Sequence, residues 1–107
     1  MNINIKRVKL IVKTPKENVN EIRQVLGNAG AGITGDYTHC SVATDFIGTF
    51  KRKDKMDITV TNGVKIEVVC DIDKAKSVIQ KVKEVHPYEE PVIDIIPLLE
   101  EEVLNLW

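Results

Sequence analysis

The sequence lacks the features that would commit it to a membrane, to nucleic acid or to an oxidising compartment. No apolar run approaches the roughly 20 residues that span a bilayer, and the first residues, MNINIKRVKL, carry no cleavage signal of a secreted protein. Its 15 basic and 16 acidic side chains leave a net charge of -1, so no overall field attracts polyanions. We therefore expect a cytoplasmic protein that binds neither nucleic acid nor membrane.

Residue patterns typical of catalysis are also scarce. The two cysteines, Cys40 and Cys70, form no C-x-x-C pair, so we expect two buried thiols rather than a disulfide or a structural zinc site. The stretch GAGITG (30–35) matches a dinucleotide-binding fingerprint, but a predicted helix precedes it and a predicted strand follows, which reverses the order that binds a pyrophosphate. We interpret these glycines as the end of a helix and a turn. The sequence therefore favours a binding module over an enzyme.

What is present is the pattern of one small α+β domain. The chain has 107 residues, of which 43% are hydrophobic and 29% charged, as in a single globular domain. Residues 6–14 alternate in polarity and predict a strand. Two stripes at helical spacing predict helices: Val19, Ile22, Val25, Leu26 and Ala29 in the first, and Ala75, Val78, Ile79, Val82 and Val85 in the second. Glycines are expected to end the first helix, and Pro87 to end the second at His86.

The middle and the end of the chain predict the remaining strands. Residues 35–45 are predicted to form a second strand that IGTF continues, with KRKDK (51–55) as a charged connector. Asn62 and Gly63, between two β-branched runs, predict a two-residue hairpin turn, and VIDIIPL predicts a last strand. The order β–α–β–β–α–β, with an extra hairpin strand, predicts a ferredoxin-like α+β sandwich, in which an antiparallel sheet carries two helices on one face.

The domain organisation follows from this order. Residues 1–107 are predicted to form one domain, in which 99–107 is a tail or short helix. Three glutamates in this tail are flanked by the apolar residues Leu99, Val103, Leu106 and Trp107. We expect the tail to lie on this chain or to dock on a protein partner.

The segment HPYEEP (86–91) is the first candidate for a site. Its two prolines are explained by structure alone, because each disfavours helical geometry in the residue before it. The histidine, the tyrosine and the two acids are not explained in that way. His86 and Glu89 can converge around the bend, whereas the adjacent Glu89 and Glu90 diverge in an extended chain. His39, on the polar face of the predicted second strand, is another candidate because imidazole is a common metal ligand.

HPYEEP also carries a resemblance to a known family. It is similar to the closing motif, HPYEEP-x-x-D-x-x-PL, of the CutA/PII-like domain of NGG-interacting-factor-three-like (YqfO-type) proteins, with Asp94, Pro97 and Leu98 completing it. An earlier family block, AGAG-x-x-G-x-Y-x-x-C, is matched by Ala29, Gly30, Ala31, Gly32, Gly35, Tyr37 and Cys40, and a second block by Gly48, Thr49 and Phe50. The likeness covers residues 8–98, and the chain resembles a free-standing copy of that domain.

The resemblance implies a PII/CutA-like subunit that closes into a homotrimer by pairing sheet edges, which would also give the exposed edges a partner. It implies that the glycine block lies near HPYEEP at one end of the sheet. The function it suggests is a non-catalytic, regulatory module that binds a small ligand or ion in clefts between subunits. The expected ligand-binding residues are Gly30, Gly32, Gly35, Tyr37, His86, Tyr88 and Glu90.

Two other functions stay open. Divalent-metal binding in the manner of CutA would use His39, His86 and Glu89, across a subunit boundary if need be, because imidazole and carboxylate suit copper, zinc or nickel. The parent proteins of the resemblance carry a dinuclear metal centre and a debated hydrolase label. Its ligands belong to flanking domains, so a part in a metallohydrolase system is the weaker alternative. No cofactor is predicted beyond a divalent ion.

The chain also departs from the family pattern. Val42 stands where the family has an aromatic residue, and Phe46 replaces the first glycine of a G-x-G pair. The connector at 51–57 is shorter than in relatives. A ligand held by that loop is therefore expected to be lost or changed.

Overall fold

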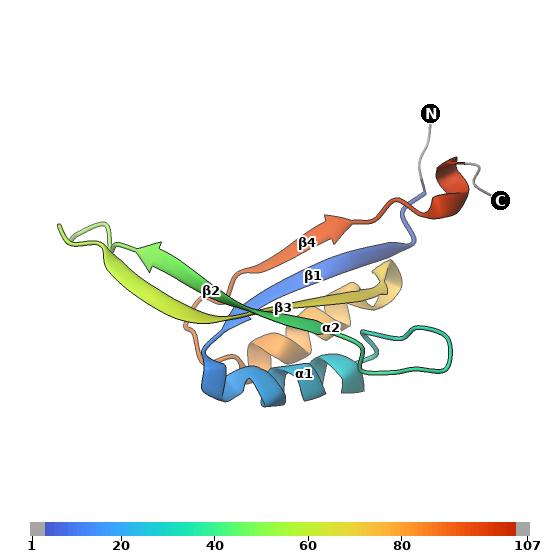
Figure 1. Cartoon of the computed structure of the whole chain (residues 1–107), viewed down its shortest axis with the longest axis horizontal. Helices are drawn as coiled ribbons and strands as arrows, with labels where there is room; N and C mark the ends of the chain where they lie inside the picture. Colours follow the sequence, from blue (N-terminus) through green and yellow to red (C-terminus); the bar gives the residue numbers. More distant parts are fainter. Residues whose placement is uncertain (1–3, 105–107) are drawn as a thin grey trace.

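The computed structural model describes residues 4–104, which form one antiparallel sheet and two helices (Figure 1). The strands are β1 (Arg7–Thr14), β2 (Val42–Phe50), β3 (Thr59–Asp71) and β4 (Ile93–Pro97), in the sheet order β2-β3-β1-β4. The helices are α1 (Val19–Asn28), which follows the 3-10 turn η1 (Lys16–Asn18), and α2 (Ile72–Val85), with a second 3-10 turn, η2 (Glu101–Leu104), near the end. Both helices cover the same face, so the predicted ferredoxin-like α+β class is confirmed.

The core lies between that face and the helices. Alternate residues of β1 and β3 pair on the helix side and are buried: Val8 with Cys70, Leu10 with Val68, Val12 with Ile66, and Thr14 with Val64. The predicted helix stripes pack against them, with Ile22, Leu26, Ala75, Val78 and Val82 buried and Val19, Val25, Ala29 and Ile79 partly buried. Burying each large aliphatic side chain contributes roughly 1.5–3 kcal/mol. This layer therefore carries most of the stability of the fold.

The predicted hairpin turn at Asn62 and Gly63 is wrong. β3 is one continuous strand, in which Asn62 pairs with Ile47 and Gly63 with Phe46 of β2. A turn of that type needs positive φ at both central residues, and neither has it. A Cβ on Gly63 would lie 2.6 Å from the Thr14 carbonyl oxygen. The glycine therefore permits a close approach of two strands. In the part of the chain that the structure describes, the sheet has four strands and no extra hairpin strand.

The second strand begins later than predicted. β2 starts at Val42, and residues 29–41 form a loop that contains a tight turn, in which Thr34 and Tyr37 exchange two backbone hydrogen bonds of 2.9 Å. Positive φ angles at Gly30, Gly32 and Gly35 interrupt extended geometry there. Cys40 lies in this loop and is exposed, so its predicted burial is wrong. Cys70 is buried as predicted, and burial raises the pKa of its thiol.

The loops after the two helices lie at opposite ends of the sheet. β1 and β3 are antiparallel, so the helices that follow them also run in opposite directions. The loop after α1 (29–41) lies beside the start of β1, and the loop after α2 (86–92) lies beside its end (Figure 1). The expectation that the glycine block lies beside HPYEEP is therefore wrong within one chain.

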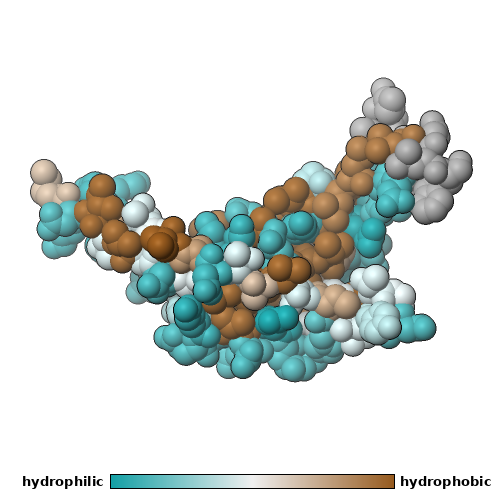
Figure 2. All heavy atoms as spheres, viewed as in Figure 1, coloured by the Kyte–Doolittle hydropathy of each residue, from teal (hydrophilic) through white to brown (hydrophobic). Residues whose placement is uncertain are grey.

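β2 and β3 continue past the helices as a two-stranded arm, here defined as residues 46–63. The molecule measures 53 × 31 × 22 Å with a radius of gyration of 15.9 Å, whereas a compact domain of this length has about 13 Å. The arm carries exposed apolar side chains, which Figure 2 shows as brown surface on the projection: Ile47, Phe50, Met56, Ile58 and Val60. KRKDK lies in its connecting loop, as predicted.

The described part of the tail is short. Leu98 donates its backbone N–H to the Arg7 carbonyl at 3.1 Å, and Arg7 holds Glu100 by two hydrogen bonds of 2.8 and 2.9 Å. The turn η2 follows, while Leu106 and Trp107 of the predicted docking tail lie outside the described residues. Within residues 4–104, neither helix has the length and apolar character needed to cross a membrane.

Candidate functional site

A cavity of about 610 Å³ lies where the arm leaves the sheet. We call it the arm-base pocket. One wall is the base of the arm, and the other is the loop after α2 that carries HPYEEP. Its lining residues are Lys13, Phe46, Gly48, Thr49, Phe50, Thr61, Tyr88 and Glu90. The pocket therefore joins the last block of the family resemblance to its Gly48-Thr49-Phe50 block, although the two are far apart in sequence.

Local sequence explains how HPYEEP reaches this position. α2 ends at Val85, and His86 turns extended with ψ 134° because Pro87 follows it. The His86 N–H still donates to the Val82 carbonyl at 2.9 Å, which closes the last turn of the helix. The chain then crosses the end of β1 before β4 begins.

The His86 ring fastens the loop after α2 to the end of β1. Its Nε2 lies 2.8 Å from the Lys13 carbonyl oxygen, and its Nδ1 lies 3.2 Å from the Tyr88 backbone nitrogen. A carbonyl only accepts and an N–H only donates, so these partners select the neutral ring with its hydrogen on Nε2. The ring also contacts the Tyr88 ring at 4.8 Å between centroids. His86 does not line the pocket itself; it positions Lys13 and Tyr88, which do.

The pocket has mixed chemistry. Lys13 Nζ lies 5.8 Å from the centre of the Phe46 ring, an arrangement in which the cation is attracted to the ring face. The hydroxyls of the threonines and of Tyr88 add hydrogen-bonding groups, and Glu90 adds a negative charge. No serine or cysteine lines the pocket to act as a nucleophile. This arrangement can bind a small polar molecule, and it holds no recognisable catalytic set.

The predicted glycine block builds a different feature. The Gly32 N–H donates to the Val69 carbonyl at 2.8 Å and the Gly32 carbonyl accepts from the Cys40 N–H at 2.9 Å, so this loop is fastened to the outer side of β3. A Cβ on Gly32 would lie 2.4 Å from the Cys40 carbonyl oxygen. Gly30, Gly35 and the exposed Tyr37 belong to the same loop. Of the predicted ligand residues, the structure thus brings only Tyr88 and Glu90 into the arm-base pocket.

His39 is part of that distant loop. It has a positive φ of 59°, and its ring lies over α1, where a Cβ on Gly27 would overlap the ring atoms. Its Nε2 lies 3.0 Å from Asn28 Oδ1 and its Nδ1 3.0 Å from Thr38 Oγ1. His39 is thus at the opposite end of the sheet from His86 and Glu89. Across residues 4–104, no three His, Cys, Asp or Glu side chains come together as a metal site.

Several pocket residues were missed from the sequence. Lys13 was treated only as the polar face of a strand, and Phe46 only as a departure from a family glycine. For Phe46, the signal that could have found it is the glycine two positions along the strand, because Phe46 and Gly48 lie on the same face and a large ring needs a small neighbour. A Cβ on Gly48 would lie 3.3 Å from that ring.

Comparison with known proteins supports the resemblance. No family model matches the chain. A relative from Bacillus subtilis (strain 168), named "GTP cyclohydrolase 1 type 2 homolog", is 38% identical over 98 residues, which cover 84% of this chain and 26% of that protein. A solved Bacillus cereus protein related to NIF3 superposes with a TM-score of 0.84 at 32% identity, over 91% of this chain and 27% of the other.

Two further solved structures share the fold over most of both chains. CutA from Archaeoglobus fulgidus, a periplasmic divalent cation tolerance protein, has a TM-score of 0.74 at 21% identity over 92% of each chain. Arabidopsis thaliana PII, solved with citrate bound, has a TM-score of 0.65 at 20% identity, over 90% of this chain and 78% of the other. The chain spans about a quarter of the length of the curated relatives it matches, and over that part it is homologous to these proteins and to the NIF3-related protein, with the CutA/PII-like fold.

Proposed function

We propose that this domain is a non-catalytic, regulatory module that binds a small molecule in the arm-base pocket and assembles as a homotrimer with that pocket at a subunit boundary. The observation that carries the proposal is the convergence of Lys13, Tyr88 and Glu90, from two distant segments, on one cavity that His86 braces. A pocket of about 610 Å³ has the size of common small-molecule sites.

The ligand chemistry that suits the pocket is a small polyanion or a polar molecule with a carboxylate. Lys13 supplies a cation, and Thr49 and Thr61 supply hydroxyl donors. The PII neighbour was solved with citrate, which is a molecule of this class. Glu90 would repel a second anionic group placed beside it. Glu90 is thus expected to set the orientation of the ligand.

Calorimetric titration with citrate tests the proposal. We expect a saturable heat with the wild-type chain and at least about tenfold weaker binding with Lys13→Gln, because a charge-assisted hydrogen bond contributes about 1.5–3 kcal/mol. Lys53→Gln, in the exposed connecting loop of the arm, is the matched control and should bind like the wild type. Equal binding by the Lys13 and Lys53 variants would place any citrate outside this pocket.

The homotrimer is supported by the surface of the arm. Ile47 is 81% exposed and Val60 68% exposed in the single chain, and the pairing of Val60 with Thr49 places both on the same face of the arm. Strands β2 and β4 are the two edges of the sheet, and each can pair with a strand of another chain. Light scattering should give three times the chain mass for the wild type and the mass of one chain for Ile47→Lys combined with Val60→Lys. Ile33→Lys, at the other end of the sheet, should stay assembled. A wild-type monomer at micromolar concentration contradicts the assembly.

Divalent-cation binding is the alternative, and the divalent cation tolerance function of the CutA neighbour favours it. In one chain His39 is remote from His86 and Glu89, so such a site needs ligands from two subunits. Titration with zinc before and after His39→Ala separates the two functions, since citrate binding does not depend on His39. We assign no cyclohydrolase activity to the module, because the Bacillus subtilis relative with that name is matched over only 26% of its length. Two free cysteines fit a cytoplasmic location.

A further inference from the structure

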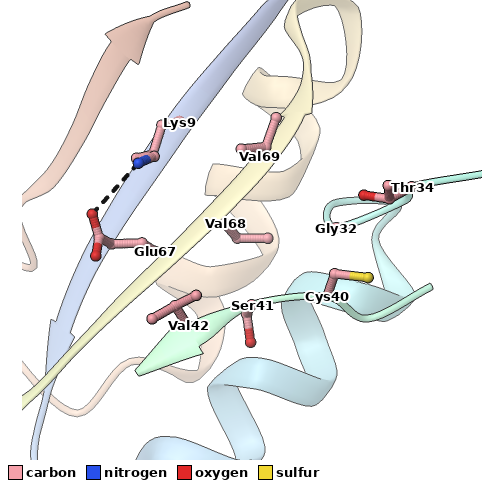
Figure 3. Close-up of a pocket in the computed structure, with 9 residues that line it drawn as sticks. All are labelled: Lys9, Gly32, Thr34, Cys40, Ser41, Val42, Glu67, Val68 and Val69. Atoms are coloured by element: carbon pink, nitrogen blue, oxygen red, sulfur yellow. Dashed lines mark ion pairs between the residues drawn. The ribbon is translucent and has the colours of Figure 1, made fainter. Parts of the chain in front are cut away.

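A second cavity, of about 310 Å³, lies at the other end of the sheet (Figure 3). We call it the corner cavity. It forms because β2 begins only at Val42, so that the loop before it passes the outer side of β3 without continuing the sheet. Strand residues provide its floor, and the loop provides its rim through Thr34, Cys40 and Ser41.

An ion pair lies at one side of this cavity. Lys9 on β1 and Glu67 on β3 approach to 3.7 Å between Nζ and Oε1 (Figure 3). This separation is longer than a good hydrogen bond. The two side chains are 37% and 27% exposed, so both remain accessible to a ligand. Val42 and Val69 present apolar surface next to them.

The rim is held in place by α1. Arg23 Nε donates to Ser41 Oγ at 2.9 Å, and a second guanidinium nitrogen lies 3.4 Å from the Ser41 carbonyl oxygen. The same loop is fastened to β3 by the hydrogen bond from Gly32 to Val69. The loop that forms the rim is therefore held by hydrogen bonds to both α1 and β3. Because it is already ordered, binding a ligand costs little conformational entropy.

The balance of charge selects the class of ligand. A simple anion would attract Lys9 but would be repelled by Glu67, and a simple cation would meet the opposite conflict. A zwitterion offers each member of the loose pair a new partner of opposite sign and leaves no charge unpaired. We propose that the corner cavity binds a small free α-amino acid with an aliphatic side chain. Its carboxylate faces Lys9, its ammonium faces Glu67, and its side chain packs on Val42 and Val69. The volume lies at the low end of ligand pockets, which suits such a molecule.

Cys40 offers a built-in reporter for the test. Its thiol lies on the rim and is exposed, whereas Cys70 is 4% exposed in the core. A thiol reagent such as 5,5′-dithiobis(2-nitrobenzoate) therefore modifies Cys40 first in the folded chain. L-valine is expected to slow this modification in a saturable way. Two analogues of the same shape serve as controls: 3-methylbutanoate, which lacks the ammonium, and 2-methylpropylamine, which lacks the carboxylate. Neither should protect at the concentration at which L-valine does.

A pair of variants completes the design. Glu67→Gln keeps the size of the side chain and removes its charge, so we expect at least about a tenfold rise in the L-valine concentration that gives half protection. Glu84→Gln, on the exposed face of α2, should behave like the wild type. Equal protection by 3-methylbutanoate, or none by L-valine, L-alanine or L-leucine at millimolar concentration, overturns the proposal. Lys13→Gln should keep L-valine protection, so this site and the arm-base pocket can fail separately.

Discussion

The two ends of β3 have the same kind of sequence and opposite surroundings. From Val64 to Cys70 its alternate residues are buried under the helices, whereas Val60 in the arm is 68% exposed. Both stretches are rich in β-branched residues, so strand formation is equally favoured in each. The difference is that helices cover one stretch, whereas nothing within residues 4–104 covers the other. The core is thus complete within one chain, and the arm has apolar surface suited to another.

The largest effect is expected from truncating one β-branched side chain to alanine at each end of β3. Ile66→Ala should lower the free energy of unfolding by about 2–5 kcal/mol, because Ile66 is fully buried. Val60→Ala should cost less than about 0.5 kcal/mol in the dissociated chain. Urea unfolding at several protein concentrations measures both. A loss for Val60→Ala that matches Ile66→Ala in dilute protein would abolish the distinction between core and arm.

The base of the arm gives the next test. Gly63→Ala would place a Cβ 2.6 Å from the Thr14 carbonyl oxygen and 3.1 Å from the Phe46 ring, so the strands must move apart, at a cost of about 1–3 kcal/mol. Gly48→Ala, where the nearest atom is a Phe46 ring carbon at 3.3 Å, should cost less. Thermal unfolding compares the two. If Gly63→Ala were neutral, the interpretation of Gly63 as a close-approach position would be wrong.

A smaller and local effect is expected where His86 fastens the loop after α2 to the end of β1. His86→Ala removes the hydrogen bonds to Lys13 and Tyr88 and should cost about 1–2 kcal/mol. The more specific readout is amide hydrogen exchange at Tyr88, which should become faster. His39→Ala, at the other end of the sheet, should leave that amide unchanged. Unaltered exchange at Tyr88 in the His86 variant would show that the ring does not hold the loop.

The smallest effect is expected far from the arm, at the pair of Arg7 and Glu100. The hydrogen bond from Arg7 lowers the pKa of the Glu100 carboxyl below its ordinary value of 4.5. The unfolded chain then takes up the proton at higher pH than the folded chain, so the stabilisation is present above pH 4.5 and is lost as the pH falls through the folded pKa. Urea unfolding of wild type and Glu100→Gln should differ at pH 7 and converge at low pH. A difference that grows on acidification contradicts this sign.

Local patterns predicted the fold well where one signal had one explanation. The helix stripes and the helix stop before Pro87 correspond to α1, α2 and the extended His86. The prediction at Gly63 was wrong because glycine is typical both of tight turns and of places where two strands approach closely. Only the position of the Thr14 carbonyl next to Gly63 shows which of the two applies. The burial of Cys40 was predicted wrongly because a strand was predicted over residues 35–45, whereas positive φ angles at Gly35 and His39 place this stretch in a loop.

The candidate site was also predicted only in part, namely where the local sequence carried a signal with one explanation. Tyr88 and Glu90 were found because HPYEEP holds polar residues that the prolines do not explain. Lys13 and Phe46 come from other strands; nothing in its own neighbourhood marks Lys13, and only the nearby Gly48 marks Phe46. His86 was expected to contact a ligand, but its two nitrogens have backbone partners that lie beyond the reach of sequence patterns.

The sequence by itself determined the α+β class, the two helices and their buried faces, because helical and strand periodicities depend on residues that are near one another in the chain. Tertiary structure decided which loops meet, which ends of the sheet carry cavities and which part of β3 is left uncovered. Those features depend on the antiparallel direction of β1 and β3 and on contacts between segments that are remote in sequence, which no local pattern records.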